Sequence, residues 1–147
     1  MTDALTLRNA HAADAAEIAR LAAELGYATP VEAMSERLGA LLSHPNHHVS
    51  VAEQGAALLG WIAVEHRCTL ESGERIEIVG LVVDASHRGG GVGRMLVADA
   101  ERWARQRGFE AISVRSNIAR DASHPFYESL GYVRRKTQHC YTKTLAP

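Results

Sequence analysis

The stretch IEIVGLVVDASHRGGGVGRML, residues 76–96, decides the fold of this chain. Residues 76–83 form a nearly continuous apolar run, which is typical of a strand buried on both faces of a mixed or parallel sheet. Four glycines follow within the five positions 89–93, and a helical pattern runs from about residue 91 to 107. Because glycine loses the most backbone freedom on folding, so many glycines are costly to order. We therefore expect the loop to hold a ligand, and the alternative is a tight turn alone.

The segments on either side alternate between predicted strands and helices. Helices are expected over residues 14–25, 31–42 and 125–130, and strands over 5–10, 48–53, 58–66, 111–116 and in two runs between 132 and 145. The strand, glycine loop, helix and strand in the middle of the chain form a right-handed βαβ crossover. The pattern predicts an α/β (α+β) fold with a mixed sheet, and we expect residues 1–147 to be a single domain.

Composition excludes several classes of protein. The hydrophobic fraction of 46% is enough for one core, and the net charge of −1 gives no reason to expect nucleic acid or an anionic membrane as a partner. We find no signal peptide and no apolar run near the roughly 20 residues that span a bilayer. Only two cysteines, Cys68 and Cys140, are present, which fits a reducing compartment. We expect a soluble, cytoplasmic protein.

The glycine loop is suited to a phosphate or pyrophosphate group. A strand that enters a helix through such a turn aims several backbone N–H groups at one point, where the positive end of the helix dipole also lies. The P-loop pattern needs a lysine that this stretch lacks, and the dinucleotide fingerprint Gly-x-Gly-x-x-Gly meets Leu96 or Arg94 at its third position. The pattern that fits is Arg-x-x-Gly-x-Gly, carried by Arg88, Gly91 and Gly93.

This pattern, after a strand ending in GLVVD, resembles the acetyl-CoA signature of the GNAT superfamily of N-acetyltransferases. FYESLGY, residues 126–132, resembles that superfamily's C-terminal Phe-Tyr-x-x-Leu-Gly-Phe/Tyr segment. The resemblance covers essentially the whole chain and implies a mixed, centrally splayed sheet of six or seven strands with about four helices. It also implies an acetyl-CoA-dependent N-acetyltransferase, in which a primary amine attacks the thioester directly in a ternary complex. The alternative is a catalytically idle acyl-CoA-binding domain that senses or scaffolds.

The resemblance assigns the acetyl-CoA site to named positions. Within the superfamily the pantetheine arm pairs with the end of the central strand, and loop amides hold the pyrophosphate. The residues implied are Leu81, Val82, Val83 and Asn117 for the arm, and Arg88, Gly89, Gly90, Gly91, Val92, Gly93 and Arg94 for the pyrophosphate. Asn117 is also a good turn residue after a strand. Gly80 predicts a bulge or a close backbone approach, at the point where relatives splay their strands, and a packing glycine is the alternative.

Tyr127 is the candidate general acid. It matches the tyrosine that, in the resembled superfamily, protonates the departing coenzyme A sulfur. The alternative is an aromatic core residue on a short helix, a role for which Phe126 is the better candidate.

Glu77 is the candidate general base. It is the one charged side chain in its apolar run, and the segment resembles the one that carries the catalytic glutamate in histone-type members. Strand alternation would place it on the face of Val79, Leu81 and Val83, and burial would favour it as a proton acceptor. Ion pairing with Arg75 or Lys143 is the alternative.

No metal site is expected. The histidines of HPNHH, residues 44–48, and of QHC, residues 138–140, lack a zinc-ligand spacing, and we expect His47 and His48 in a solvated loop. We therefore expect a reaction that uses no metal. The partner is an amine substrate whose structure the sequence does not identify. The resemblance also suggests a homodimer, although the sequence identifies no interface.

Overall fold

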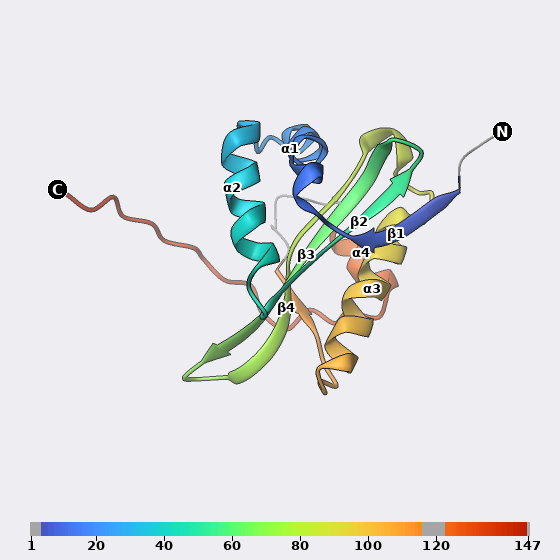
Figure 1. Ribbon diagram of the computed structural model, residues 1–147. Coiled ribbons are helices and arrows are strands. Elements are labelled where there is room, and N and C mark those ends of the chain that lie inside the picture. Colours follow the sequence, from blue (N-terminus) through green and yellow to red (C-terminus); the bar gives the residue numbers. More distant parts are fainter. Residues whose placement is uncertain (1–3, 116–122, 147) are drawn as a thin grey trace. The chain divides into compact units, whose positions relative to one another are not determined.

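The computed structural model describes residues 4–115 and 123–146 (Figure 1). In chain order its elements are β1 Leu5–Asn9, η1 Ala12–Asp14, α1 Ala15–Glu24, α2 Val31–Leu42, β2 His47–Gln54, β3 Ala57–Thr69, β4 Gly73–Val83, η2 Ala85–His87, α3 Val92–Gln106, β5 Ser113–Val114 and α4 Ser123–Ser129. The chain divides into two units, Met1–Arg115 with the sheet and Ser116–Pro147 with α4. Among the described residues no helix is both long and apolar enough to cross a membrane.

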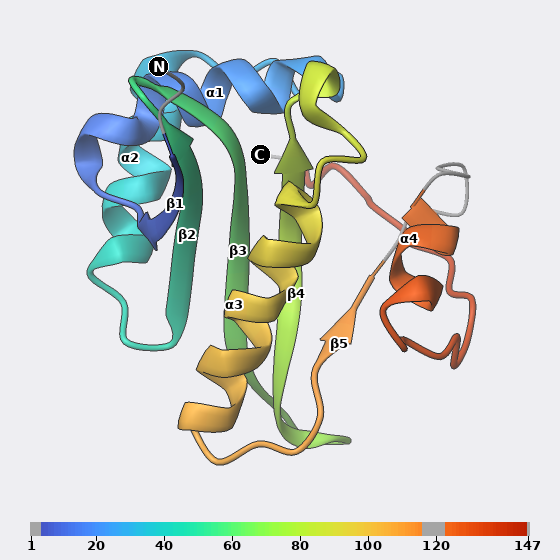
Figure 2. The same cartoon turned by 90° about the vertical axis from the view of Figure 1, so that its right-hand side faces the viewer.

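The first unit is built on a five-stranded sheet in the order β1-β2-β3-β4-β5. Strands β1 to β4 pair antiparallel with their neighbours, and β5 joins β4 in parallel after the crossover through α3. Helices α1 and α2 cover one face and α3 covers the other (Figure 1 and Figure 2). This arrangement confirms the predicted mixed α/β fold. It also explains the continuous apolar run in β4, because a strand covered on both faces needs apolar side chains on both.

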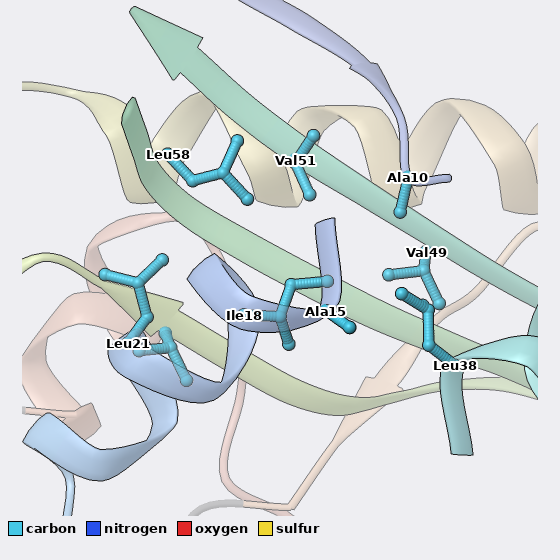
Figure 3. Packing of buried hydrophobic residues seen from close by; sticks show 9 residues of the cluster. Ala10, Ala15, Ile18, Leu21, Leu38, Val49, Val51 and Leu58 are labelled. Carbon is cyan, nitrogen blue, oxygen red and sulfur yellow. The ribbon is translucent and has the colours of Figure 1, made fainter. Parts of the chain in front are cut away.

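The core between the sheet and helices α1 and α2 fixes the position of α1. Ile18 and Leu21 of α1 and Leu38 of α2 belong to one buried cluster with Val51 of β2 and Leu58 of β3 (Figure 3). Their helical spacing in the sequence is the spacing that places them on one side of each helix. With its apolar side held in this core, α1 turns its polar side toward the end of β4, where the glycine loop begins.

Strand β4 carries a bulge at Val79. Two consecutive residues of β3 pair with Ile78 and Gly80 of β4, which are not consecutive. Val79 between them therefore has no partner in β3, and its side chain is half exposed. A Cβ atom on Gly80 would lie only 2.8 Å from Cζ3 of Trp61. The bulge predicted from Gly80 is thus present, one residue earlier at Val79, and the ring of Trp61 against Gly80 shows that the alternative, a packing glycine, holds as well.

Replacing Gly80 with alanine is expected to lower the free energy of unfolding by about 2 kcal/mol, because the added methyl group overpacks the contact with Trp61. Gly39→Ala, within α2, is the matched control. A Cβ atom there meets nothing within 4 Å, so the same change should stabilise the protein by about 0.5–1 kcal/mol. Urea unfolding measures both variants. Equal shifts of the same sign would contradict the close approach at Gly80.

The predicted strand number is too high for the residues that the structure describes. Six or seven strands were expected and five are present, because residues 133–146, which were to hold the last two, are all exposed and have no regular secondary structure. The strand predicted over residues 111–116 shortens to Ser113–Val114. An alternating pattern marks a segment that is able to form a strand, but a strand also requires a second backbone to complete its hydrogen bonds.

Candidate active site

Strands β4 and β5 run side by side over only a short length. Their ladder pairs Glu77 with Ser113 and Ile78 with Val114, and the bulge at Val79 follows immediately. Figure 2 shows β5 beside the lower half of β4, while the upper half continues to the glycine loop without it. In the part of the chain that the structure describes, this edge of β4 has no strand partner after the bulge. We call this stretch of β4, residues 79–83, the open edge of β4.

Hydrogen-bond alternation determines which main-chain groups face that edge. The amide of Asp84 donates to the carbonyl of Leu59 at 2.8 Å, so Asp84 turns its main chain toward β3. In an antiparallel ladder this orientation recurs at every second residue, and Val82 therefore also faces β3. Leu81 and Val83 direct their N–H and C=O groups the other way. Of the three β4 residues predicted to bind the pantetheine arm, Leu81 and Val83 offer main-chain groups at the open edge and Val82 does not.

The glycine loop, residues 88–94, joins the end of that edge to α3. Gly89 and Gly91 have φ angles of +84° and +88°, in the left-handed region that disfavours side chains. Gly91 is the cap residue of α3. The first helical turn leaves three amides without an acceptor inside the helix, those of Val92, Gly93 and Arg94. With the positive end of the helix dipole, these amides make an anion-binding site beside the open edge of β4.

The residues of the glycine loop differ in how far they are buried. Val92 is 3% exposed and Gly93 is buried, so both can offer a ligand only their amides. Arg88 and Arg94 are exposed and add positive charge on either side of the glycines. The structure thus brings together, on one loop, all seven residues predicted to bind the pyrophosphate.

A pocket of about 430 Å³ adjoins the glycine loop. Its lining residues are Leu5, Gln54, Leu59, Ser86, His87, Arg88, Gly89, Gly90 and Val92. Its walls come from β1, β2, β3, η2 and the loop, so it shares Arg88, Gly89, Gly90 and Val92 with the predicted pyrophosphate site.

Helix α1 holds the start of the glycine loop in place. Asp84 caps η2 by accepting hydrogen bonds from the amide and hydroxyl of Ser86 at 2.9 and 2.6 Å. Arg20 of α1 lies 3.2 Å from the same carboxylate and also donates to the carbonyl of Leu58 at 3.0 Å. The hydrogen bonds from Ser86, aided by Arg20, hold the pKa of Asp84 well below its usual range. Sequence reasoning missed this anchor, because only the fold brings α1 beside residue 84.

Replacing Asp84 with alanine is expected to lower the free energy of unfolding by about 1 kcal/mol at pH 7, since the cap of η2 is lost. The lowered pKa means that the ionised carboxylate stabilises the folded protein above about pH 4, and that this contribution is lost as the pH falls further. The difference between wild type and variant should therefore shrink in acid. Urea unfolding at pH 7, 5 and 3 measures it.

Asp84→Asn is the control for this experiment, because asparagine also caps helices but carries no charge. If Asp84→Asn keeps most of the free energy of unfolding at pH 7 but loses its dependence on pH in acid, the capping of η2 and the charge of Asp84 contribute separately. A difference in the free energy of unfolding between wild type and Asp84→Ala that does not change with pH would contradict a stabilising role for the ionised carboxylate.

Glu77 lies among three arginines. Its side chain is 5% exposed, and Oε2 accepts a hydrogen bond from Nη1 of Arg67 at 2.8 Å. Oε1 lies 3.4 Å from Nε of Arg115 and 3.8 Å from Nη2 of Arg75. The ion pair with Arg75, weighed above as the alternative to a catalytic role, is thus present. The sequence did not point to Arg67 or Arg115, which reach Glu77 from β3 and from the end of β5.

The bulge moves Glu77 to the face opposite the one expected. Glu77 pairs with Glu65, whereas Leu81 pairs with Ile62, three residues along β3 and hence on the other face. The expectation that Glu77 shares a face with Leu81 is therefore wrong, because the extra residue in β4 reverses the alternation. Glu77 instead shares a face with Val82, on the side of the sheet that α1 and α2 cover.

Tyr127 lies in α4, in the second unit. Its ring packs edge-on against those of Phe126 and Tyr132, with centroids 5.1 and 5.7 Å away. Its carbonyl accepts from the amide of Tyr132 at 3.1 Å, which closes the end of the helix. The FYESLGY segment is therefore a short helix with its terminal turn. Asn117 lies outside the described residues.

A Ser-His-Asp group joins β2 to α3 but lacks the geometry of a nucleophilic triad. Ser50 donates directly to Asp99 at 2.6 Å, and Nε2 of His48 lies 2.9 Å from both. A relay would use the two ring nitrogens separately, and Ser50 is 1% exposed. The ring of His48 stacks on Trp103. The expectation of a solvated loop at His47 and His48 is wrong, because β2 begins at His47, which pairs with Glu65 of β3.

Comparison with known proteins gives consistent matches. The Acetyltransferase (GNAT) family matches residues 14–132. An aminoalkylphosphonate N-acetyltransferase of Salmonella typhimurium (strain LT2) is 34% identical over 115 residues, which are 78% of this chain and 73% of that protein. The uncharacterized N-acetyltransferase YhdJ of Bacillus subtilis (strain 168) is 28% identical over 119 residues, 80% and 84% of the two chains. The solved aminoglycoside N-acetyltransferase AAC(6')-Iy in complex with CoA has the same fold, with a TM-score of 0.87 over 97% of each chain at 18% identity.

Proposed function

Because the chain belongs to the acetyltransferase (GNAT) family and is an N-acetyltransferase, we propose that its glycine loop and the open edge of β4 together hold acetyl-CoA for direct attack by an amine. One observation carries the proposal. The amides at the start of α3 and the outward main-chain groups of Leu81 and Val83 lie at the same end of β4. The amides of α3 suit the pyrophosphate of acetyl-CoA, and the main-chain groups of Leu81 and Val83 suit its extended pantetheine arm, which contains amides.

In the proposed reaction the neutral amine attacks the thioester carbonyl carbon. The new C–N bond forms as the C–S bond breaks, the amine gives up one proton, and the coenzyme A sulfur takes up another. The amide of Val83, at the open edge, is positioned to polarise the carbonyl oxygen, whereas that of Val82 is turned toward β3. We assign proton uptake from the amine to Glu77, through water, and protonation of the sulfur to Tyr127.

Two classes of acceptor are worth testing first. The Salmonella relative is named for aminoalkylphosphonates, which carry an anionic group, and the coenzyme A-bound structural neighbour is named for aminoglycosides, which carry several amines. Aminoalkylphosphonates and aminoglycosides differ in charge. A screen that measures thiol release with members of both classes shows which of them the protein acetylates.

The first test of the function is calorimetric titration of the protein with acetyl-CoA, followed by that screen. Micromolar binding with thiol release in the presence of an amine would support the proposal. Binding without transfer to any amine would favour an idle acyl-CoA-binding domain. Absence of binding would overturn the proposal.

Replacing Glu77 with glutamine tests its role as base. The rate is expected to fall mainly on the low-pH side, where the amine is mostly ammonium and depends on a base, and to recover as pH rises. The measurement is kcat/KM against pH for wild type and variant, together with the thermal midpoint of each. A pH–rate profile unchanged in shape would remove Glu77 from the mechanism and leave it as the countercharge of its three arginines.

A further inference from the structure

Three arginines form a cluster on the face of the sheet that α1 and α2 cover. This arginine cluster consists of Arg67, Arg75 and Arg115 around the carboxylate of Glu77. Arg67 and Arg75 are directly opposite each other on β3 and β4, and Glu77 is opposite Glu65. Cross-strand partners share a face, so these side chains project together.

The cluster carries more positive than negative charge, and one of its two carboxylates is buried. Three guanidinium groups meet two carboxylates, since Glu65 lies 3.5 Å from Nε of Arg67, and one positive charge is left in excess. Glu77 is 5% exposed, while the side chains of Arg67, Arg75 and Arg115 are 28, 32 and 62% exposed. Nε of Arg75 is buried and has no hydrogen-bond partner among the described residues. The arginines therefore keep donor capacity that the two carboxylates do not use.

The cluster lies close to the place where the acetyl group would react. Glu77 is two residues before Val79, where the open edge of β4 begins. The strand rises about 10 Å between Glu77 and Leu81, and an arginine side chain extends over part of that distance. A small amine whose nitrogen reaches the open edge would thus hold the rest of its structure near the cluster.

We propose that the arginine cluster binds an anionic group, a phosphonate or a carboxylate, on the acceptor amine. The inference rests on the proposed acetyl transfer and adds to it the chemical class of the acceptor. Guanidinium groups recognise phosphonate and carboxylate through paired, charge-assisted hydrogen bonds. A polycationic acceptor would instead meet the excess positive charge, which Glu65 and Glu77 together do not balance.

Four primary amines of similar size test the proposal. They are 2-aminoethylphosphonate, β-alanine, propylamine and 1,3-diaminopropane, so the group at the far end is a phosphonate, a carboxylate, a methyl group or a second ammonium. Thiol release gives kcat and KM for each. The two anionic amines are expected to exceed the other two in kcat/KM by about 100-fold, mostly through KM. Equal use of all four, or preference for 1,3-diaminopropane, would overturn the inference while leaving acetyl transfer intact.

Arg75→Gln and Arg115→Gln assign the effect to the cluster. Each is expected to lower the ratio of kcat/KM for 2-aminoethylphosphonate to kcat/KM for propylamine about 10-fold, because a change that reaches the rate through Glu77 acts on both amines alike. Arg67 is left unchanged, because its removal would take the hydrogen bond from the buried Glu77. Arg105→Gln, on the exposed side of α3 with its side chain 70% exposed, is the control and should leave every constant unchanged.

The remaining outcomes also decide the question. A rise in KM for acetyl-CoA instead of for the amine would mean that the cluster serves the donor's phosphates, and would overturn the inference. If no amine is acetylated, titration of 2-aminoethylphosphonate into the protein saturated with coenzyme A separates the two claims. Binding lost in Arg75→Gln would support the anion site although the proposed transfer fails, and absence of binding would overturn both.

Discussion

Gly91→Glu is expected to weaken acetyl-CoA binding by at least about 100-fold, a loss of about 2.7 kcal/mol. Gly91 has a φ of +88°, and a side chain in that region costs about 1–2 kcal/mol of strain. The new carboxylate also stands beside the free amides of α3, where it would occupy the anion site and repel a pyrophosphate. Isothermal titration with acetyl-CoA measures the effect.

Gly108→Glu is the matched control, because Gly108 has nearly the same φ, +87°, and follows the other end of the same helix. The two variants carry the same strain and the same added charge, but the dipole of α3 disfavours that charge at Gly108, so Gly108→Glu should lose at least as much stability and still bind acetyl-CoA like the wild type. Wild-type affinity in Gly91→Glu would mean that the glycines only form a turn. Equal losses of binding in both variants would trace the effect to the stability of α3 and would also contradict the site.

Tyr127→Phe is expected to lower kcat about 100-fold, because the ring is kept and only the hydroxyl that would protonate the sulfur is removed. KM for acetyl-CoA and the thermal midpoint should change little, since the edge-on ring contacts of residue 127 remain available to phenylalanine. Steady-state thiol release over a range of both substrates separates kcat from KM.

Tyr141→Phe, at a position 89% exposed, makes the same chemical change away from α4 and should leave kcat unaltered. If Tyr127→Phe retains kcat within about twofold of wild type, another group must protonate the sulfur. A fall in kcat matched by a fall in the thermal midpoint would assign the hydroxyl to the stability of the second unit instead.

Features that depend on neighbours in the sequence were predictable. The loop of residues 89–93 needs glycine at the two positions of positive φ, and β4 needs apolar residues on both faces. Both requirements produce a recognisable pattern of residues within a stretch of about twenty positions. The order of strand, loop and helix was therefore readable from the stretch 76–96 alone.

Features that depend on distant segments were not predictable from local pattern. The bulge at Val79 could be suspected from Gly80, but its effect on Glu77 follows only from the register with β3. Arg67 and Arg115 approach Glu77 from segments 10 and 38 positions away. The strands expected after residue 132 needed a partner that no local pattern specifies. The role of Asn117, the homodimer and the cytoplasmic location remain predictions.

The single extra residue in β4 divides the strand into two parts that can evolve independently. Before Val79, residues 75 and 77 belong to the arginine cluster on the face under α1 and α2; after it, Leu81 and Val83 turn their main chains to the open edge. Main-chain pairing tolerates many side chains, so the part of β4 that we propose as the donor site would constrain the sequence mainly through its backbone. On the proposed assignment, changes of charge at residues 75 and 115 would redirect the enzyme to new acceptors without rebuilding the part of β4 that would hold the donor, which is a route by which one scaffold diversifies.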